Sequence, residues 1–186
     1  MFFSKWTTCL RSTRDATRRA FALCGLTLLP LLPLPTATAA EPLPAPKGPI
    51  ILLVSGNISV TNTPEGAAFD RQMLIDLGQT ETRTTTPWTD GVQVFEGVLG
   101  RAVMERVEAE GETVKAAALN DYTVELPLDD FLNYDVLLAL DMNGEEMRVS
   151  DKGPIWIVYP RDDVPELNNR LLHDRWVWQL KSLQVQ

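Results

Sequence analysis

The chain is poor in two residue types on which catalytic and metal sites often depend. Only two of its 186 residues are cysteines, Cys9 and Cys24, and only one, His173, is a histidine. Both cysteines lie in the first forty residues, which we expect to be removed. The remaining chain would then have no disulfide, no thiolate metal ligand and no cysteine nucleophile. A lone histidine in a charged stretch is typical of polar surface, so the sequence predicts no catalytic residue and no metal site.

The chain also lacks a glycine-rich phosphate loop and an apolar run long enough to cross a membrane. Its apolar stretch at residues 21–29 is followed by Pro30, Pro33 and Pro35. A membrane-spanning helix needs roughly 20 apolar residues without such breaks. We therefore expect no nucleotide site of this kind and no stable association with a membrane.

The first forty residues have the three parts of a secretory signal. Five basic residues precede the apolar stretch, and small residues at 36–40 close the segment. We expect cleavage after Ala39 or Ala40 and a location in the periplasm. The stretch Thr17-Arg18-Arg19-Ala20-Phe21 resembles the twin-arginine export motif, so both that pathway and the general pathway remain open.

Positive charge is scarce in the rest of the chain. The whole sequence has 17 basic and 25 acidic residues, and the first forty positions hold five and one of these. Residues 41–186 therefore carry 12 basic and 24 acidic side chains, a net charge of −12. Such a surface repels phosphate backbones and anionic lipids, which excludes nucleic acid and membrane as expected partners. A chain of about 146 residues can form one self-supporting domain.

Hydrophobic patterning predicts one α+β domain with a mixed sheet at residues 50–186, after a proline-rich linker at 41–49 that does not pack. Strands are expected at residues 50–55, 81–86, 114–119, 122–126, 136–140, 146–149, 155–159 and 176–185. Helices are expected from Thr63 to Leu77, with a proline at the first position, and from Gly97 to Glu110, which has an apolar stripe. Asn143-Gly144 predicts a tight hairpin.

Acidic and aromatic residues leave alternatives open. The pairs Asp129-Asp130, Glu145-Glu146 and Asp162-Asp163 are interpreted as solvated acids. Residues 141–145 have the odd spacing of a calcium loop but lack its downstream glycine and bidentate glutamate. Aromatic residues in strands more often belong to a core, although these six could line a pocket: Trp88, Tyr122, Trp156, Tyr159, Trp176 and Trp178.

Five segments, in the same order, resemble those of the sulfite-oxidase-type molybdopterin-binding domain family. Residues 85–99 are similar to its W-T-G-V-x-x-x-G-V-x-L-x-x-L element, and residues 119–128 to its D-G-Y-x-x-x-x-P-L segment. Residues 136–145 look like its L-L-A-x-x-M-N-G-E hairpin, residues 152–160 like G-x-P-x-R-L-V-V-P, and residues 175–178 like the start of its last strand. The resemblance implies a mixed-sheet, barrel-like fold that holds a molybdenum–pterin cofactor in active members.

The resemblance also implies a cysteine thiolate that binds the metal, in a T-x-x-C-A-G-N type loop before the Trp-Thr-Gly element. Here residues 82–84 run directly into Thr85-Thr86-Pro87-Trp88, so the loop is short and the cysteine is absent. Molybdenum is soft and favours that thiolate. We therefore expect a non-catalytic member without a cofactor. It would be a periplasmic ligand-binding or accessory protein, serving a small ligand, a membrane sensor or a redox partner.

An alternative is an oxidoreductase that holds molybdopterin without a cysteine ligand. Arg161 and Arg175 would then contact the anionic cofactor, and Trp88 and Tyr122 would form the walls of its pocket. A third class, a structural or adhesive domain, predicts no pocket at all.

Overall fold

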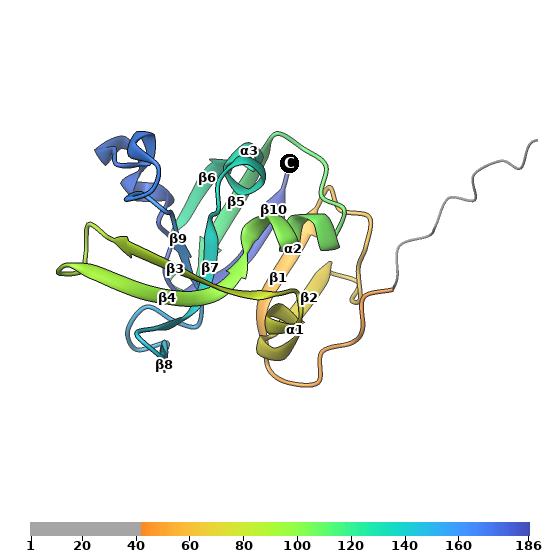
Figure 1. Ribbon diagram of the computed structural model, residues 1–186. Coiled ribbons are helices and arrows are strands. Elements are labelled where there is room, and N and C mark those ends of the chain that lie inside the picture. Colours follow the sequence, from red (N-terminus) through yellow and green to blue (C-terminus); the bar gives the residue numbers. More distant parts are fainter. Residues whose placement is uncertain (1–41) are drawn as a thin grey trace, which may run out of the picture. The chain divides into compact units, whose positions relative to one another are not determined.

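Two five-stranded sheets form the frame of the part of the chain that the computed structural model describes, residues 42–186 (Figure 1). The expected signal, with both cysteines, lies outside the described residues. The first sheet has the order β2-β1-β10-β5-β6, and the second has the order β3-β4-β7-β8 with β9 also paired to β7. The strands of the first sheet are β1 (Ile50–Gly56), β2 (Ala67–Asp70), β5 (Thr113–Ala118), β6 (Thr123–Pro127) and β10 (Leu180–Val185). Those of the second are β3 (Gln79–Thr85), β4 (Val92–Leu99), β7 (Leu137–Met142), β8 (Glu145–Glu146) and β9 (Trp156–Val158).

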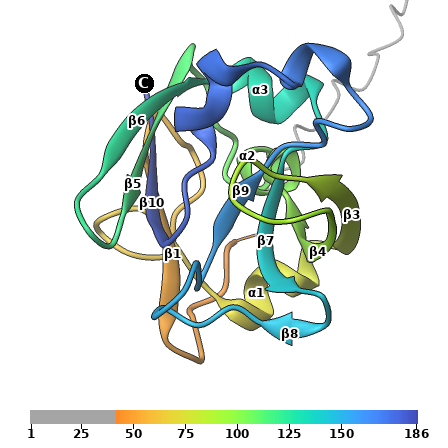
Figure 2. The ribbon, with the colours of Figure 1, turned by 90° about the vertical axis from the view of Figure 1, so that its left-hand side faces the viewer.

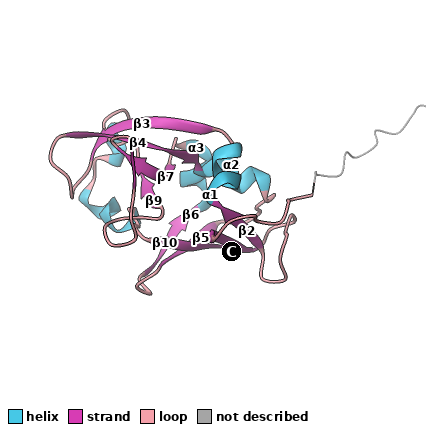
Figure 3. Cartoon of the chain, turned by 90° about the horizontal axis from the view of Figure 1, so that it is seen from below, coloured by secondary structure: helices cyan, strands magenta, loops and turns pink. Residues whose placement is uncertain are grey.

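The α+β class and the mixed sheet are confirmed, whereas the barrel-like closure is not. The strands β1 and β10 pair in parallel, and the other pairings in the two sheets are antiparallel. Within residues 42–186 neither sheet closes on itself. Figure 3 shows the two sheets as separate layers. No helix in this part of the chain is long and apolar enough to cross a membrane.

The core lies between these layers. Strand β9 is buried along its whole length and β7 at every residue but the last, as expected for continuous apolar runs. Strand β5 instead alternates between buried and partly exposed residues, so one of its faces is towards solvent. The helices α1 (Arg71–Asp76), α2 (Gly100–Arg106) and α3 (Leu128–Asn133) are short, as are the 3-10 helices η1 (Pro165–Leu167) and η2 (Arg170–Arg175).

The first predicted helix is wrong at its start. Thr63 and Gly66 close a turn, residues 67–70 form β2, and α1 begins only at Arg71. Asp70 caps this helix, because its Oδ1 accepts the backbone N–H of Met73 at 2.9 Å. Its Oδ2 accepts the N–H groups of Lys47 and Gly48 at 2.7 and 2.8 Å. The bond from Met73, followed by that from Gly48, holds the pKa of Asp70 below its usual value.

The proline-rich segment does pack, contrary to expectation. Leu43 is buried in the core, and the carbonyl of Pro44 accepts the Asn62 side-chain amide at 2.7 Å. With the two bonds to Asp70, these contacts place residues 43–48 against β2. The sequence alone showed prolines and no partner, because the partner groups lie at positions 62 and 70.

The second predicted helix, residues 97–110, is also wrong in its first turn. Residues 92–99 form β4, and only Gly100–Arg106 are helical. Gly97 lies at a bulge where β4 meets β7, and a Cβ there would be 2.1 Å from the carbonyl oxygen of Leu138. Glycine is therefore needed for close strand pairing rather than for helix entry.

Three predicted strands are shorter than expected, among them residues 155–159, of which only Trp156–Val158 form β9, and the hairpin is confirmed. Residues 146–149 contribute only to β8 at Glu145–Glu146, and the last strand begins at Leu180 rather than at Trp176. Asn143 and Gly144 have φ values of 55° and 78°, as a two-residue hairpin turn requires.

Candidate functional site

A pocket with a volume of about 320 Å³ opens where three segments meet. The loop between β3 and β4 supplies Trp88, the turn between β5 and β6 supplies Asn120 and Tyr122, and residues 173–178 supply the remaining polar and aromatic wall. The β3–β4 loop and the η1–η2 segment lie on the same side of the molecule in Figure 1, and Figure 2 views that side directly. The volume lies at the lower end of the range for small-molecule sites.

The indole of Trp88 is the centre of the aromatic wall. Its ring centroid lies 5.3 Å from that of Trp178, 5.8 Å from His173 and 5.9 Å from Trp176. The contacts with Trp178 and His173 are edge-on, an arrangement that aromatic pairs favour. Trp88 nevertheless remains 37% exposed. It is therefore a wall residue with a free surface rather than a core residue.

The loop that carries Trp88 is held by hydroxyl and carboxylate groups. The Oγ1 atoms of Thr86 and Thr89 lie 2.8 Å apart, and Thr86 Oγ1 accepts the N–H of Trp88 at 3.0 Å. Asp162 accepts both the N–H and the hydroxyl of Thr85, at 2.6 and 2.7 Å. Asp162 is thus exposed but anchors the start of the loop, a role that its interpretation as a solvated acid did not include.

Tyr122 lies on the opposite wall and connects it to η2. Its hydroxyl donates to the backbone carbonyl of Asp174 at 3.1 Å, and its N–H donates to Asn120 Oδ1 at 3.1 Å. Partial burial, followed by the negative charge of Asp174, raises the pKa of Tyr122. The phenol therefore stays neutral at physiological pH.

Arg175, the third predicted site residue, is next to the pocket but not in its wall. Its Nη1 donates to Asp130 Oδ2 at 2.7 Å, and the same oxygen accepts the hydroxyl of Tyr159 at 2.9 Å. Asp130 is only 6% exposed, so its interpretation as a solvated acid is wrong. Burial, then the charge of Asp130, raises the pKa of Tyr159 well above its ordinary value. This Asp130–Tyr159–Arg175 network fixes the end of η2 to α3 and to the residue after β9.

Arg161, the fourth predicted site residue, lies outside the pocket wall. Its Nη2 donates to Asn168 Oδ1 at 2.8 Å, and its Nε lies 4.0 Å from Asp162 Oδ1. The structure thus brings Trp88 and Tyr122 together and leaves Arg161 and Arg175 out of the pocket wall. A role for any of the four in holding a cofactor stays a prediction.

Three polar wall residues were not among the predicted site residues: Asn120, His173 and Asp174. His173 was interpreted as exposed polar surface, but its ring contacts that of Trp88. The sequence holds one clue, since His173 and Asp174 directly precede the aromatic stretch Trp176-Val177-Trp178.

The wall of the pocket does not fit an anionic molybdenum–pterin group. It contains no lysine or arginine and one carboxylate, Asp174. Residues 42–186 contain no cysteine, and no three His, Asp or Glu side chains in that range are grouped so that they could hold a metal ion. Phosphate recognition normally uses cationic donors, and molybdenum favours a thiolate.

Comparison with known proteins gives one finding. The family model of the oxidoreductase molybdopterin binding domain matches residues 70–162, which is half of the chain. Among curated proteins, no significant match was found. The matched range includes Trp88, Asn120 and Tyr122 of the pocket and ends before residues 173–178. The chain therefore belongs to the oxidoreductase molybdopterin-binding domain family.

Proposed function

We propose that this chain is an exported, non-catalytic member of its family that acts as a ligand-binding or accessory protein in the periplasm. The observation that carries the proposal is the aromatic pocket, whose wall has neither a thiolate nor a cationic side chain. Export rests on the three-part signal in the first forty residues.

The loop before Trp88 supports the non-catalytic part of the proposal. In active relatives the resemblance implies a metal-binding cysteine in this region. Here Thr84 Oγ1 donates to the carbonyl of Thr85 at 3.3 Å, and the hydroxyls of Thr85 and Thr86 bond to Asp162 and Thr89. All three hydroxyls therefore hold the loop together, which leaves the short loop without a free ligand to replace the thiolate.

The polar wall supports ligand binding rather than a purely structural role. A structural or adhesive domain predicts no pocket, whereas this pocket has exposed aromatic rings and the side chains of Asn120, His173 and Asp174. A small ligand would bind here, and a membrane sensor or redox partner would then receive the loaded protein.

The alternative, an oxidoreductase that holds molybdopterin without a cysteine, is less well supported. It needs Arg161 and Arg175 as anion contacts. Arg175 pairs with Asp130 and Arg161 donates to Asn168, so both guanidinium groups already have protein partners. Both residues also lie outside the pocket wall, so neither is placed to contact an anion bound there.

Metal and pterin analysis tests the proposal. The full chain is expressed in a host that makes molybdopterin, and the exported protein is purified beside a cysteine-containing member of the family. We expect molybdenum and pterin fluorescence far below stoichiometric amounts in this protein and stoichiometric amounts in the control. Stoichiometric molybdenum and pterin in both proteins would overturn the proposal.

A further inference from the structure

Aromatic rings with exposed surface dominate the wall of the pocket. Trp88 is 37% exposed and Tyr122 is 44% exposed, although both are large side chains. Trp178 and His173 contact the ring of Trp88. Exposed aromatic rings around a cavity offer their surfaces to a ligand, and such rings attract cations because their faces carry partial negative charge.

The charge of the pocket wall also favours a cationic ligand. With His173 counted as neutral, Asp174 is the one charged side chain among the described residues that line the pocket. Arg175, which follows Asp174 directly, and Lys181, three residues after Trp178, are each paired with another carboxylate, at 2.7 Å to Asp130 and 2.8 Å to Asp121. The negative charge of Asp174 is therefore left for a ligand.

A cation of the protein already lies against the same aromatic cluster. Lys152 Nζ lies 5.5 Å from the centroid of the Trp156 ring and 3.1 Å from Asp151 Oδ1. Trp156 in turn contacts Trp88, with a centroid separation of 6.3 Å. An indole ring and a carboxylate together thus hold an ammonium group here, and the pocket has the same two components without a protein cation.

We propose that the pocket binds an organic ammonium ion, with an alkylated nitrogen against the indole rings of Trp88 and Trp178 and its charge towards Asp174. This inference rests on the proposed function and names the ligand class. A quaternary nitrogen fits better than a primary one, because a primary ammonium is more strongly hydrated. The volume of about 320 Å³ leaves room for a substituent beside the head group.

A matched pair of probes tests this charge preference. Choline and 3,3-dimethylbutan-1-ol have the same shape, but carbon replaces the charged nitrogen in the second. Binding to the purified mature protein is measured by calorimetry and by tryptophan fluorescence. We expect choline to bind at least about tenfold more tightly than the neutral alcohol, since the rings and the carboxylate act on charge.

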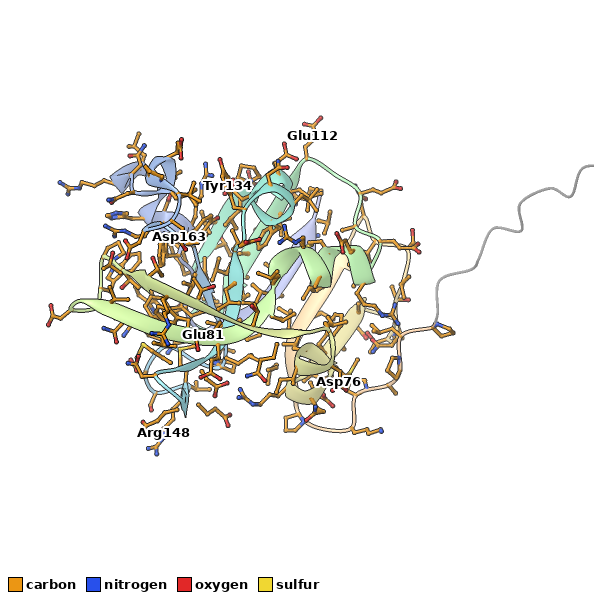
Figure 4. All side chains as sticks on the ribbon, in the orientation of Figure 1. Asp76, Glu81, Glu112, Tyr134, Arg148 and Asp163 are labelled. Atoms are coloured by element: carbon orange, nitrogen blue, oxygen red, sulfur yellow. The ribbon has the colours of Figure 1, made fainter. Side chains whose placement is uncertain are left out.

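Two charge-neutralising variants locate the effect. Asp174→Asn should weaken choline binding about threefold to tenfold and leave the binding of the alcohol unchanged. Glu112→Gln removes the same charge from the loop before β5, where Glu112 projects into solvent (Figure 4) and does not line the pocket. The six residues of β5 span roughly 20 Å, so this control should bind choline like the parent protein.

A third variant tests the rings. Trp88→Leu should abolish measurable binding of choline, with thermal melting as the check that the protein remains folded.

Equal affinity for the two probes, or no binding of choline, would overturn the ammonium assignment. A choline affinity that is the same in Asp174→Asn and in the parent protein would also overturn it. None of these results bears on the absence of a molybdenum cofactor. The proposed function fails separately, if the exported protein contains stoichiometric molybdenum and pterin.

Discussion

Two tyrosine–aspartate pairs, Tyr159–Asp130 in the core and Tyr122–Asp174 at the pocket, differ in what compensates the charge of the aspartate. In the core, Asp130 accepts the hydroxyl of Tyr159 and pairs with Arg175. At the pocket, the hydroxyl of Tyr122 donates to the backbone of Asp174, and no cation within residues 42–186 pairs with the Asp174 carboxylate. The same residue types thus complete a structural network in one place and leave a recognition surface in the other.

The difference follows from burial. Asp130 has a side chain that is 8% exposed, and its buried carboxylate is compensated by the guanidinium of Arg175. Asp174 is exposed, so water solvates its charge. We therefore expect changes in the core pair to affect stability and changes in the pocket pair to affect binding.

The largest expected effect is on Asp130. Asp130→Ala leaves Arg175 and the Tyr159 hydroxyl without their partner and should lower the free energy of unfolding by about 2 to 4 kcal/mol. The value lies below that of a fully buried pair because the Arg175 side chain is 26% exposed. Urea denaturation measures the change. The control Asp129→Ala alters an exposed neighbour on α3 and should stay within about 0.5 kcal/mol; equal losses in the two variants would contradict a buried network.

Removal of the two tyrosine hydroxyls should have smaller effects on the free energy of unfolding, and the loss should again be greater in the core than at the pocket. Tyr159→Phe removes a buried hydrogen bond and should cost about 1 to 2 kcal/mol. Tyr122→Phe removes a bond at an exposed position and should cost less than about 0.5 kcal/mol. Both substitutions keep the ring, so they compare the hydroxyl groups alone. A greater loss for Tyr122→Phe would reverse the assignment of the two regions.

At alkaline pH, the core tyrosine Tyr159 should make the stability of the protein depend on pH. The pKa of Tyr159 is raised above its ordinary value of 10.0, mainly by burial, so the folded state favours the neutral phenol. Its contribution to stability is fully present below pH 10 and is lost as the pH rises through the folded-state value. We expect the free energy of unfolding to fall above about pH 10, and to fall less in Tyr159→Phe. Identical pH profiles would show that Tyr159 does not contribute.

The smallest expected effect is that of Asp174→Asn on stability. Because this carboxylate is solvated and lies in an acidic chain, the change should alter the free energy of unfolding by less than about 0.5 kcal/mol. The same variant is the one expected to lose choline affinity. A loss of more than about 1 kcal/mol would indicate that Asp174 supports the fold rather than a ligand.

Local signals in the sequence predicted local structure well. Asn143-Gly144 predicted the hairpin, since a two-residue turn with positive φ favours that pair. The apolar stretches at residues 50–55 and 155–159 predicted β1 and β9. The stripe after Gly97 was misleading, because the same apolar residues serve a strand and then a short helix. The close contact of Gly97 with β7 is a tertiary feature that no local pattern contains.

The candidate site was predicted only in part, for the same reason. Trp88 and Tyr122 were named as pocket walls from the resemblance to the family, and both line the pocket. Arg175 lies outside the pocket wall and pairs with Asp130, a partner 45 residues away that no local pattern indicates. His173 and Asp174 were overlooked because only the folded η2 segment brings them against Trp88.

Native mass spectrometry of the exported protein tests the central claim most directly, because one spectrum gives the cleavage site and the bound mass. We predict the mass of the chain cut after Ala39 or Ala40, alone or with a small organic cation. A population dominated by that chain plus a molybdenum–pterin cofactor would contradict the account.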